Sequence, residues 1–174
     1  MLGHVVRAWG LALVVVACSG DDPAPERGPD RFCDGVCQAA VRCGNWTDET
    51  ACHRDCIESR PGLVNFSADG AGHLGACIAN FGCDTLSNES LWDPAFQTCW
   101  DDARVVVAPT AKVRSFCSRY AEAWFECGSW YSTDDCEQIY GMWSEAVLDR
   151  VLVCQSQPTC ADLDACVTNV FDSL

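Results

Sequence analysis

The chain has 174 residues with fifteen cysteines, and 25 acidic residues against 11 basic ones give it a net charge of −14. This charge excludes a protein that binds nucleic acid, because a phosphate backbone would be repelled. After the N-terminal segment no apolar run is long enough to cross a bilayer, so we expect no transmembrane helix there. The density of cysteine is typical of a disulfide framework in an oxidising compartment.

Residues 1–17 are predicted to form a signal peptide. Arg7 precedes the apolar core LALVVVA, and small residues follow it where cleavage occurs. The tetrapeptide VVAC, Val15–Cys18, resembles the lipobox of bacterial lipoproteins. The resemblance implies that Cys18 carries a lipid and becomes the first residue of the mature protein. Because Ser19 rather than aspartate follows the cysteine, it also implies the outer membrane. The alternative is an ordinary secretory signal that holds a cysteine by chance.

Residues 18–31 are predicted to combine the lipidated cysteine with a disordered tether. The segment SGDDPAPERGPDR has three prolines, two glycines and six charges but no large apolar side chain, so it cannot bury surface. Cysteine parity supports this interpretation. Fifteen is odd, and giving Cys18 to a lipid leaves fourteen cysteines for disulfides.

An internal duplication covers most of the remaining chain. FCDGVCQAAVRCGNW at 32–46 aligns without a gap with FCSRYAEAWFECGSW at 116–130, and Phe, Cys, Gly and Trp recur at the same offsets. Further on, ACIANFGC at 76–83 aligns with VCQSQPTC at 153–160. The spacings therefore predict two copies of one unit, of which the first has eight cysteines and the second has six.

We expect an all-α fold of two small tandem modules, each a disulfide-stapled helical hairpin or bundle. Ala108-Pro109-Thr110 interrupts the chain, which places the modules at 32–108 and 110–174. Units of this size bury too little surface to be comfortably stable. Three or four disulfides at about 2–4 kcal/mol each offset that deficit.

Helix signals stand at several points. Asp93 followed by Pro94 predicts an N-cap and a first-turn proline, with a helix through about Val107. Ser132 resembles the start of a capping box and predicts a helix that runs to about Cys154. Strand-like alternation is almost absent, which favours the all-α class.

The mismatch between the copies guides the predicted disulfides. Cys37 and Cys56 have no counterpart in the second copy, as expected if the two form one bond. An antiparallel hairpin that turns at residues 44–46 brings further cysteines together. The predicted pairs are therefore Cys37–Cys56, Cys43–Cys52 and Cys127–Cys136. Three connectivities stay open in each copy for the remaining cysteines, which are Cys33, Cys77, Cys83 and Cys99 in the first copy and Cys117, Cys154, Cys160 and Cys166 in the second.

No motif predicts catalysis, a metal or another cofactor. Cys52-His53 with Cys56 offers zinc ligands, but disulfides are favoured in an oxidising compartment. No CxxC, GxSxG or HExxH sequence occurs. We therefore expect no enzyme, and the competing hypothesis is an enzyme without a recognisable motif. That hypothesis requires His53, His73 and carboxylates to share a pocket.

Three tryptophans are candidate binding residues, because tryptophan is enriched at binding hot spots. Trp46 and Trp130 hold the same place in the two copies, and Trp92 lies in a segment inserted in the first copy. The alternative for Trp46 and Trp130 is that each packs its own hairpin turn against a third helix.

The segments CDGVC, CHRDC and VCQSQPTCADLDAC resemble the cysteine-rich helical lipoproteins of myxobacteria and related bacteria. The resemblance implies a lipid-anchored protein of the cell envelope, bound to the membrane through its N-terminal lipid, with a periplasmic or extracellular body. We expect a binding or structural module whose partner is an envelope or surface protein. A second alternative is a secreted eukaryotic cysteine-rich domain, with glycans at the N-x-S/T sequons of Asn45, Asn65 or Asn88.

Overall fold

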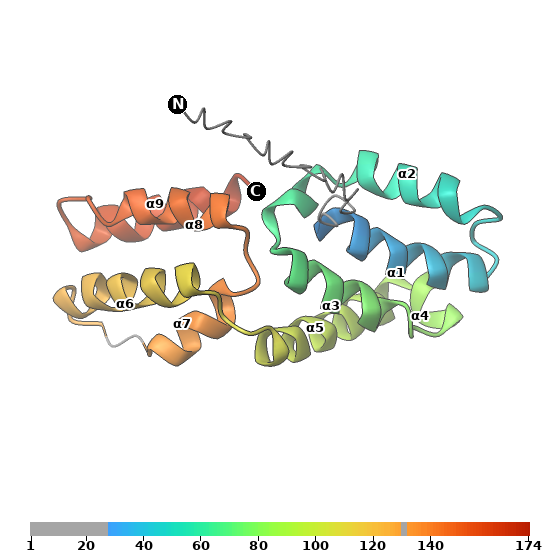
Figure 1. Ribbon diagram of the computed structural model, residues 1–174, viewed down its shortest axis with the longest axis horizontal. Coiled ribbons are helices and arrows are strands. Elements are labelled where there is room, and N and C mark those ends of the chain that lie inside the picture. The colour runs from blue at the N-terminus through green and yellow to red at the C-terminus, as the bar shows by residue number, and fades with distance from the viewer. Residues whose placement is uncertain (1–27, 130–131) are drawn as a thin grey trace, which may run out of the picture.

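The structure is a computed structural model that describes residues 28–129 and 132–174. Over these residues the chain forms nine α-helices and one 3-10 helix, and a lone antiparallel bridge between Phe66 and Trp143 is the β pairing found there. The helices gather into two lobes that lie side by side (Figure 1). The expectation of an all-α, disulfide-stapled fold is confirmed. The predicted signal peptide, Cys18 and Trp130 lie outside the described residues.

The first lobe is built from α1 (Gly28–Arg42), α2 (Glu49–Ser59), η1 (Pro61–Asn65), α3 (Ala68–Ile78), α4 (Cys83–Ser87) and α5 (Glu89–Val106). Its first helix corrects the predicted tether, because residues 28–31 are helical rather than disordered. Gly28 is buried, and a Cβ atom there would lie 3.3 Å from the Cβ of Ala71 in α3. The start of α1 is thus packed on α3, which composition alone did not reveal.

The second lobe is built from α6 (Ala111–Glu126), α7 (Thr133–Tyr140), α8 (Glu145–Cys154) and α9 (Cys160–Asp172). The sequence alignment pairs α6 with α1, α7 with α2 and α8 with α3. Its last helix corresponds to α4 and α5 together, because Cys160 matches Cys83 and Cys166 matches Cys99.

Two predicted helix boundaries are wrong. Ser132 caps α7 as expected, but that helix ends at Tyr140, and a loop separates it from α8. The helix α5 begins at Glu89 because Asn88 accepts a hydrogen bond from the Ser90 amide. Pro94 therefore lies inside α5, where its missing N–H removes one intrahelical hydrogen bond.

Seven disulfides join all fourteen cysteines of the described residues, and none of the three predicted pairs is among them. The predictions Cys37–Cys56, Cys43–Cys52 and Cys127–Cys136 are wrong. The observed pairs are Cys33–Cys56, Cys37–Cys52, Cys43–Cys83, Cys77–Cys99, Cys117–Cys136, Cys127–Cys160 and Cys154–Cys166.

The geometry of antiparallel helices explains the correction in α1 and α2. Stepping four residues forward from Cys33 to Cys37 is matched by stepping four residues back from Cys56 to Cys52. Both bonds therefore lie on one helical face. Cys43 comes after the last residue of α1, where the chain turns at Gly44 with φ of 74°. Its sulfur bonds to Cys83 at the start of α4 instead of to α2.

Glycines allow α1 and α3 to cross in close contact. A Cβ atom on Gly35 would overlap the backbone of Gly75, and one on Gly75 would lie 2.9 Å from the Cα of Phe32. Real Cβ atoms do not approach other atoms so closely, so larger side chains would push the helices apart. This crossing fixes the first lobe around its buried core, which includes Phe32, Leu74 and Ile78.

The loop at 141–144, between α7 and α8, joins the two lobes. Met142 is fully buried and packs in the core of the first lobe, although its neighbours in sequence belong to the second. The amide of Ser67 donates to the Met142 carbonyl at 2.9 Å, and the amide of Ser144 donates to the Asn65 carbonyl at 2.7 Å. The lobes are thus docked through backbone hydrogen bonds and a shared core residue.

Candidate functional site

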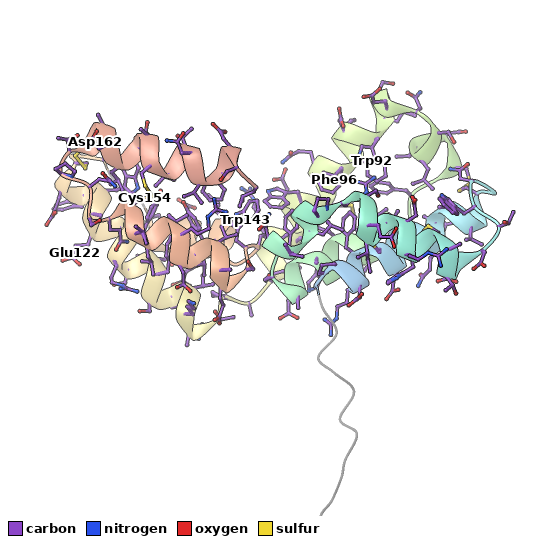
Figure 2. All side chains as sticks on the ribbon, turned by 90° about the horizontal axis from the view of Figure 1, so that it is seen from above. Trp92, Phe96, Glu122, Trp143, Cys154 and Asp162 are labelled. Atoms are coloured by element: carbon purple, nitrogen blue, oxygen red, sulfur yellow. A yellow bond between two sulfur atoms is a disulfide. The ribbon has the colours of Figure 1, made fainter. Side chains whose placement is uncertain are left out.

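The predicted binding tryptophans do not form one site. Trp46 follows α1 in the turn that leads to α2, and it is 38 % exposed. Trp130 lies outside the described residues. Trp92 lies in α5 and is half-buried, with its ring edge-to-face with Phe81 at 5.5 Å and stacked on Phe96 at 6.1 Å. Figure 2 shows Trp92 beside Phe96 in the first lobe. Trp46 is therefore the better placed of the two for contact with a partner.

An aromatic cluster at the junction of the lobes was missed by the sequence analysis. Phe66 stacks on Trp143 with ring centroids 5.1 Å apart, and Trp100 meets both rings at 5.8 Å. Phe171 of α9 lies 5.3 Å from Trp143. The sequence predicts one helix from Ser132 to about Cys154, and nothing in its periodicity indicates the loop between α7 and α8 that holds Trp143. Figure 2 places it at this junction.

A groove of about 460 Å³ runs between α1 and α3 and carries polar side chains. Arg31 and Asp69 form an ion pair of 3.5 Å across it, and Asp34, Gln38 and His73 line it as well. The two helices hold these side chains at a fixed separation, because α1 and α3 are in direct contact where they cross at Gly35 and Gly75. The groove is wide open, and its lining contains no serine, threonine or cysteine that would act as a nucleophile. Its chemistry suits binding by hydrogen bonds and charge.

His53 and His73 lie in different hollows. His53 lines a second hollow of about 340 Å³, beside Asp34. Its Nε2 atom lies 3.2 Å from a carboxylate oxygen of Asp34 and 3.2 Å from the carbonyl of Asp30. Asp34 borders both hollows, so it is the one residue that links the two histidines. A pocket that gathers both histidines with carboxylates, as the enzyme hypothesis requires, is not found among the described residues.

The zinc ligands considered from the sequence are used otherwise in the structure. The sulfurs of Cys52 and Cys56 are bonded to Cys37 and Cys33, and His53 contacts Asp34. In residues 28–129 and 132–174, no three His, Cys, Asp or Glu side chains are placed to hold one metal ion. Within the same ranges no helix has the length and apolarity needed to cross a membrane.

Lys112, the sole lysine of the chain, links α6 to α8. Its Nζ atom lies 2.9 Å from Asp149 and 3.3 Å from Glu145. The hydrogen bond to Asp149 raises the pKa of Lys112, loss of hydration acts in the opposite direction, and Glu145 adds to the rise. The ammonium group thus stays charged between its two carboxylates over the whole physiological range.

Comparison with known proteins adds no relative: no protein-family model, no curated protein and no solved structure matches the chain.

Proposed function

We propose that this chain is a lipid-anchored protein of the cell envelope, with Cys18 as the lipidated residue. The observation that carries the proposal is the completeness of the disulfide set. Every cysteine from Cys33 to Cys166 is bonded to another cysteine of the same chain. Cys18 consequently has no cysteine of its own chain left to pair with, and it stands in the sequence VVAC. Lipidation gives this remaining thiol a role.

The body is proposed to act as a binding or structural module without catalysis. Seven disulfides over so short a chain favour a rigid scaffold in an oxidising compartment. The groove between α1 and α3 offers fixed charges of both signs, from Arg31, Asp34 and Asp69, and this suits a polar segment of an envelope or surface protein. Trp46, exposed in the α1–α2 turn, supplies an apolar contact on the same lobe.

The contacts of the sequons argue against a glycan at one of the three sites of the secreted, glycosylated alternative. Asn88 caps α5, with its side-chain oxygen accepting from the Ser90 amide at 3.0 Å. Asn65 donates from its side chain to the Leu174 carbonyl at 3.3 Å. A glycan on the nitrogen of Asn65 would disturb this contact, whereas the contact of Asn88 uses the side-chain oxygen and is compatible with a glycan. Asn45 and Asn88 are both exposed.

The test is the intact mass of the native protein, extracted from membranes without reductant, beside two matched variants. We expect the mature chain to start at Cys18 and to carry acyl groups and seven disulfides. Cys18→Ser should abolish acylation and release the protein from the membrane fraction. The control is the double variant Cys43→Ser/Cys83→Ser, which removes one disulfide and keeps Cys18. This variant should stay acylated. An unacylated wild-type chain in the soluble fraction would contradict the proposal.

A further inference from the structure

Two of the disulfides differ from the other five in their accessibility to solvent. Cys83 and Cys160 are exposed, and their respective partners Cys43 and Cys127 are half-buried. Each of the other five bonds contains at least one buried cysteine. Because a thiolate must reach a sulfur atom to break a disulfide, access decides which bonds exchange first. The two accessible bonds should therefore react before the rest of the set.

The accessible bonds also join the two halves of each lobe. In the first lobe, the less accessible bonds tie α1 to α2 and α3 to α5, and Cys43–Cys83 connects the end of α1 to the start of α4. In the second lobe, they tie α6 to α7 and α8 to α9, and Cys127–Cys160 connects the end of α6 to the start of α9. We call Cys43–Cys83 the first bridging bond and Cys127–Cys160 the second bridging bond. The helix ends that they join lie away from the junction of the lobes (Figure 1).

The first lobe has further contacts beside its bridging bond. Arg42 donates from Nη1 to the Ala79 carbonyl and from Nη2 to the Phe81 carbonyl, both at 2.6 Å. These carbonyls follow directly after α3, so the guanidinium ties the end of α1 to the end of α3. The crossing at Gly35 and Gly75 adds direct contact between the two helices. Breaking the first bridging bond should therefore leave α1 and α3 together.

The second lobe has neither of these contacts at the aligned positions. Glu126 aligns with Arg42, and a carboxylate cannot donate hydrogen bonds to carbonyl groups. The glycine pair of the crossing is also replaced by larger residues. The contact of Lys112 with Asp149 and Glu145 joins α6 to α8 at the start of α6, far along the helix from the second bridging bond. Both lobes keep an apolar core, so the second bridging bond differs from the first in having less support from its neighbours.

We propose that the second bridging bond is a site of thiol exchange, and that its reduction by a dithiol protein opens the second lobe. One thiolate of the dithiol attacks a sulfur of the bond and forms a mixed disulfide, which releases the other cysteine. The second thiol of the dithiol then displaces the bound cysteine, so the bond gains two electrons and two protons while the partner becomes a disulfide. The α6–α7 and α8–α9 pairs keep their own disulfides and separate from each other, whereas the first lobe stays closed. The inference does not depend on the lipid anchor or on the groove between α1 and α3.

The first experiment tests the order of reduction in the oxidised full-length protein. Dithiothreitol in limiting amount serves as the dithiol probe, new thiols are alkylated at short times, and peptide mass spectrometry locates them. We expect the four cysteines of the two bridging bonds to be alkylated about tenfold faster or more than the others, because their sulfurs are reached without opening the fold. Alkylation of all seven bonds at similar rates would overturn the proposal.

The second experiment compares two matched double variants, Cys127→Ser/Cys160→Ser and Cys43→Ser/Cys83→Ser, by amide hydrogen exchange. Loss of the second bridging bond should raise exchange in α8 and α9 about tenfold or more, whereas loss of the first should leave α1 and α3 protected. The same measurement on the partly reduced wild-type protein covers the case in which a variant folds with scrambled disulfides. Unchanged exchange in the second lobe, or an equal loss of protection in both lobes, would overturn the proposal.

Discussion

The two lobes share one repeated sequence pattern, yet α3 packs against α1 in a different way from α8 against α6. In the first lobe, α1 and α3 touch through Gly35 and Gly75. At the aligned positions of the second lobe stand Arg119, which is exposed, and Leu152, so α6 and α8 have no glycine pair at which their backbones could touch. Lys112 then joins those helices through Asp149 and Glu145. Duplication therefore preserved the order of the helices while the contacts between them diverged.

The disulfides show which contacts the duplication kept. Cys43–Cys83 aligns with Cys127–Cys160, and Cys77–Cys99 aligns with Cys154–Cys166. The first two helices differ, because two bonds join α1 to α2 and a single bond, Cys117–Cys136, joins α6 to α7. In the second lobe Tyr140 takes the place of Cys56 and packs against both Phe116 and Tyr120, which are themselves stacked. Aromatic packing there replaces a covalent bond.

The largest expected effect comes from adding a side chain at the point where α1 and α3 cross. Gly75→Ala places a Cβ atom against the backbone of Arg31 and Phe32, which is not free to move away. We expect the first lobe to lose about 3 kcal/mol of stability or more, and oxidative folding to yield scrambled disulfides. Urea unfolding and mapping of the disulfides measure both.

Gly82→Ala is the matched control, because nothing lies within 4 Å of its added Cβ atom and its φ is −68°. Because Gly82 is the N-cap of α4, alanine there should cost about 1 kcal/mol or less and leave the disulfide pattern unchanged. Equal stability of the Gly75 and Gly82 variants would mean that α1 and α3 are not in close contact.

The second effect distinguishes the doubly bonded helix pair from the singly bonded one. Removing Cys117–Cys136 by substitution with alanine should cost about 3 kcal/mol and release α7. Removing Cys33–Cys56 should cost a similar amount but leave α2 in place, since Cys37–Cys52 still holds it. Amide hydrogen exchange resolves the difference, with fast exchange expected in α7 and continued protection in α2. If α2 exchanged as fast as α7, the remaining bond Cys37–Cys52 would not be what holds α2 in place.

Individual residues show how much of the fold could be predicted from the sequence. The repeat spacing gave the paired lobes, and helix signals such as Ser132 were placed correctly. The pairing of Cys43 could not be predicted, because Cys43 lies beyond the end of α1 and its partner Cys83 belongs to α4, which is brought there by tertiary packing. Nor could the aromatic cluster at the junction of the lobes, because Phe66, Trp100 and Trp143 come from segments far apart in sequence. Periodicity describes one helix at a time and holds no information on which helices meet.

Met142 tests whether the docked lobes unfold together. Its side chain is fully buried in the core of the first lobe while its loop belongs to the second. Met142→Ala should leave a cavity that costs about 2–3 kcal/mol and should weaken the junction. We expect one thermal transition in the wild type and two in the variant, because each lobe then keeps only its own core. Calorimetry measures this, and one unsplit transition in the variant would contradict the coupling. Leu163→Ala, in the core of the second lobe, is the control for a cavity away from the junction.

The smallest effect concerns Lys112 and pH, and it separates the second lobe from the first. Because Asp149 and Glu145 raise the pKa of Lys112 above its ordinary value of 10.5, the folded state holds this proton more tightly than the unfolded state. The resulting stability is complete below pH 10.5 and is lost as the pH rises through the folded pKa.

Lys112→Arg isolates this contribution, since arginine stays charged throughout the range. Tyrosines also ionise at high pH, but they do so in both proteins, so the difference between the two alkaline unfolding curves reports Lys112 alone. We expect the wild type to lose stability earlier than the arginine variant, and by a small margin because the group is exposed to solvent. The loss should fall on α6 and α8, where hydrogen exchange would rise first. Superimposable alkaline unfolding curves would mean that the apolar core alone holds α8 against α6, without help from Lys112. In the first lobe the position aligned with Lys112 is Gly28, which has no side chain to make such a contact.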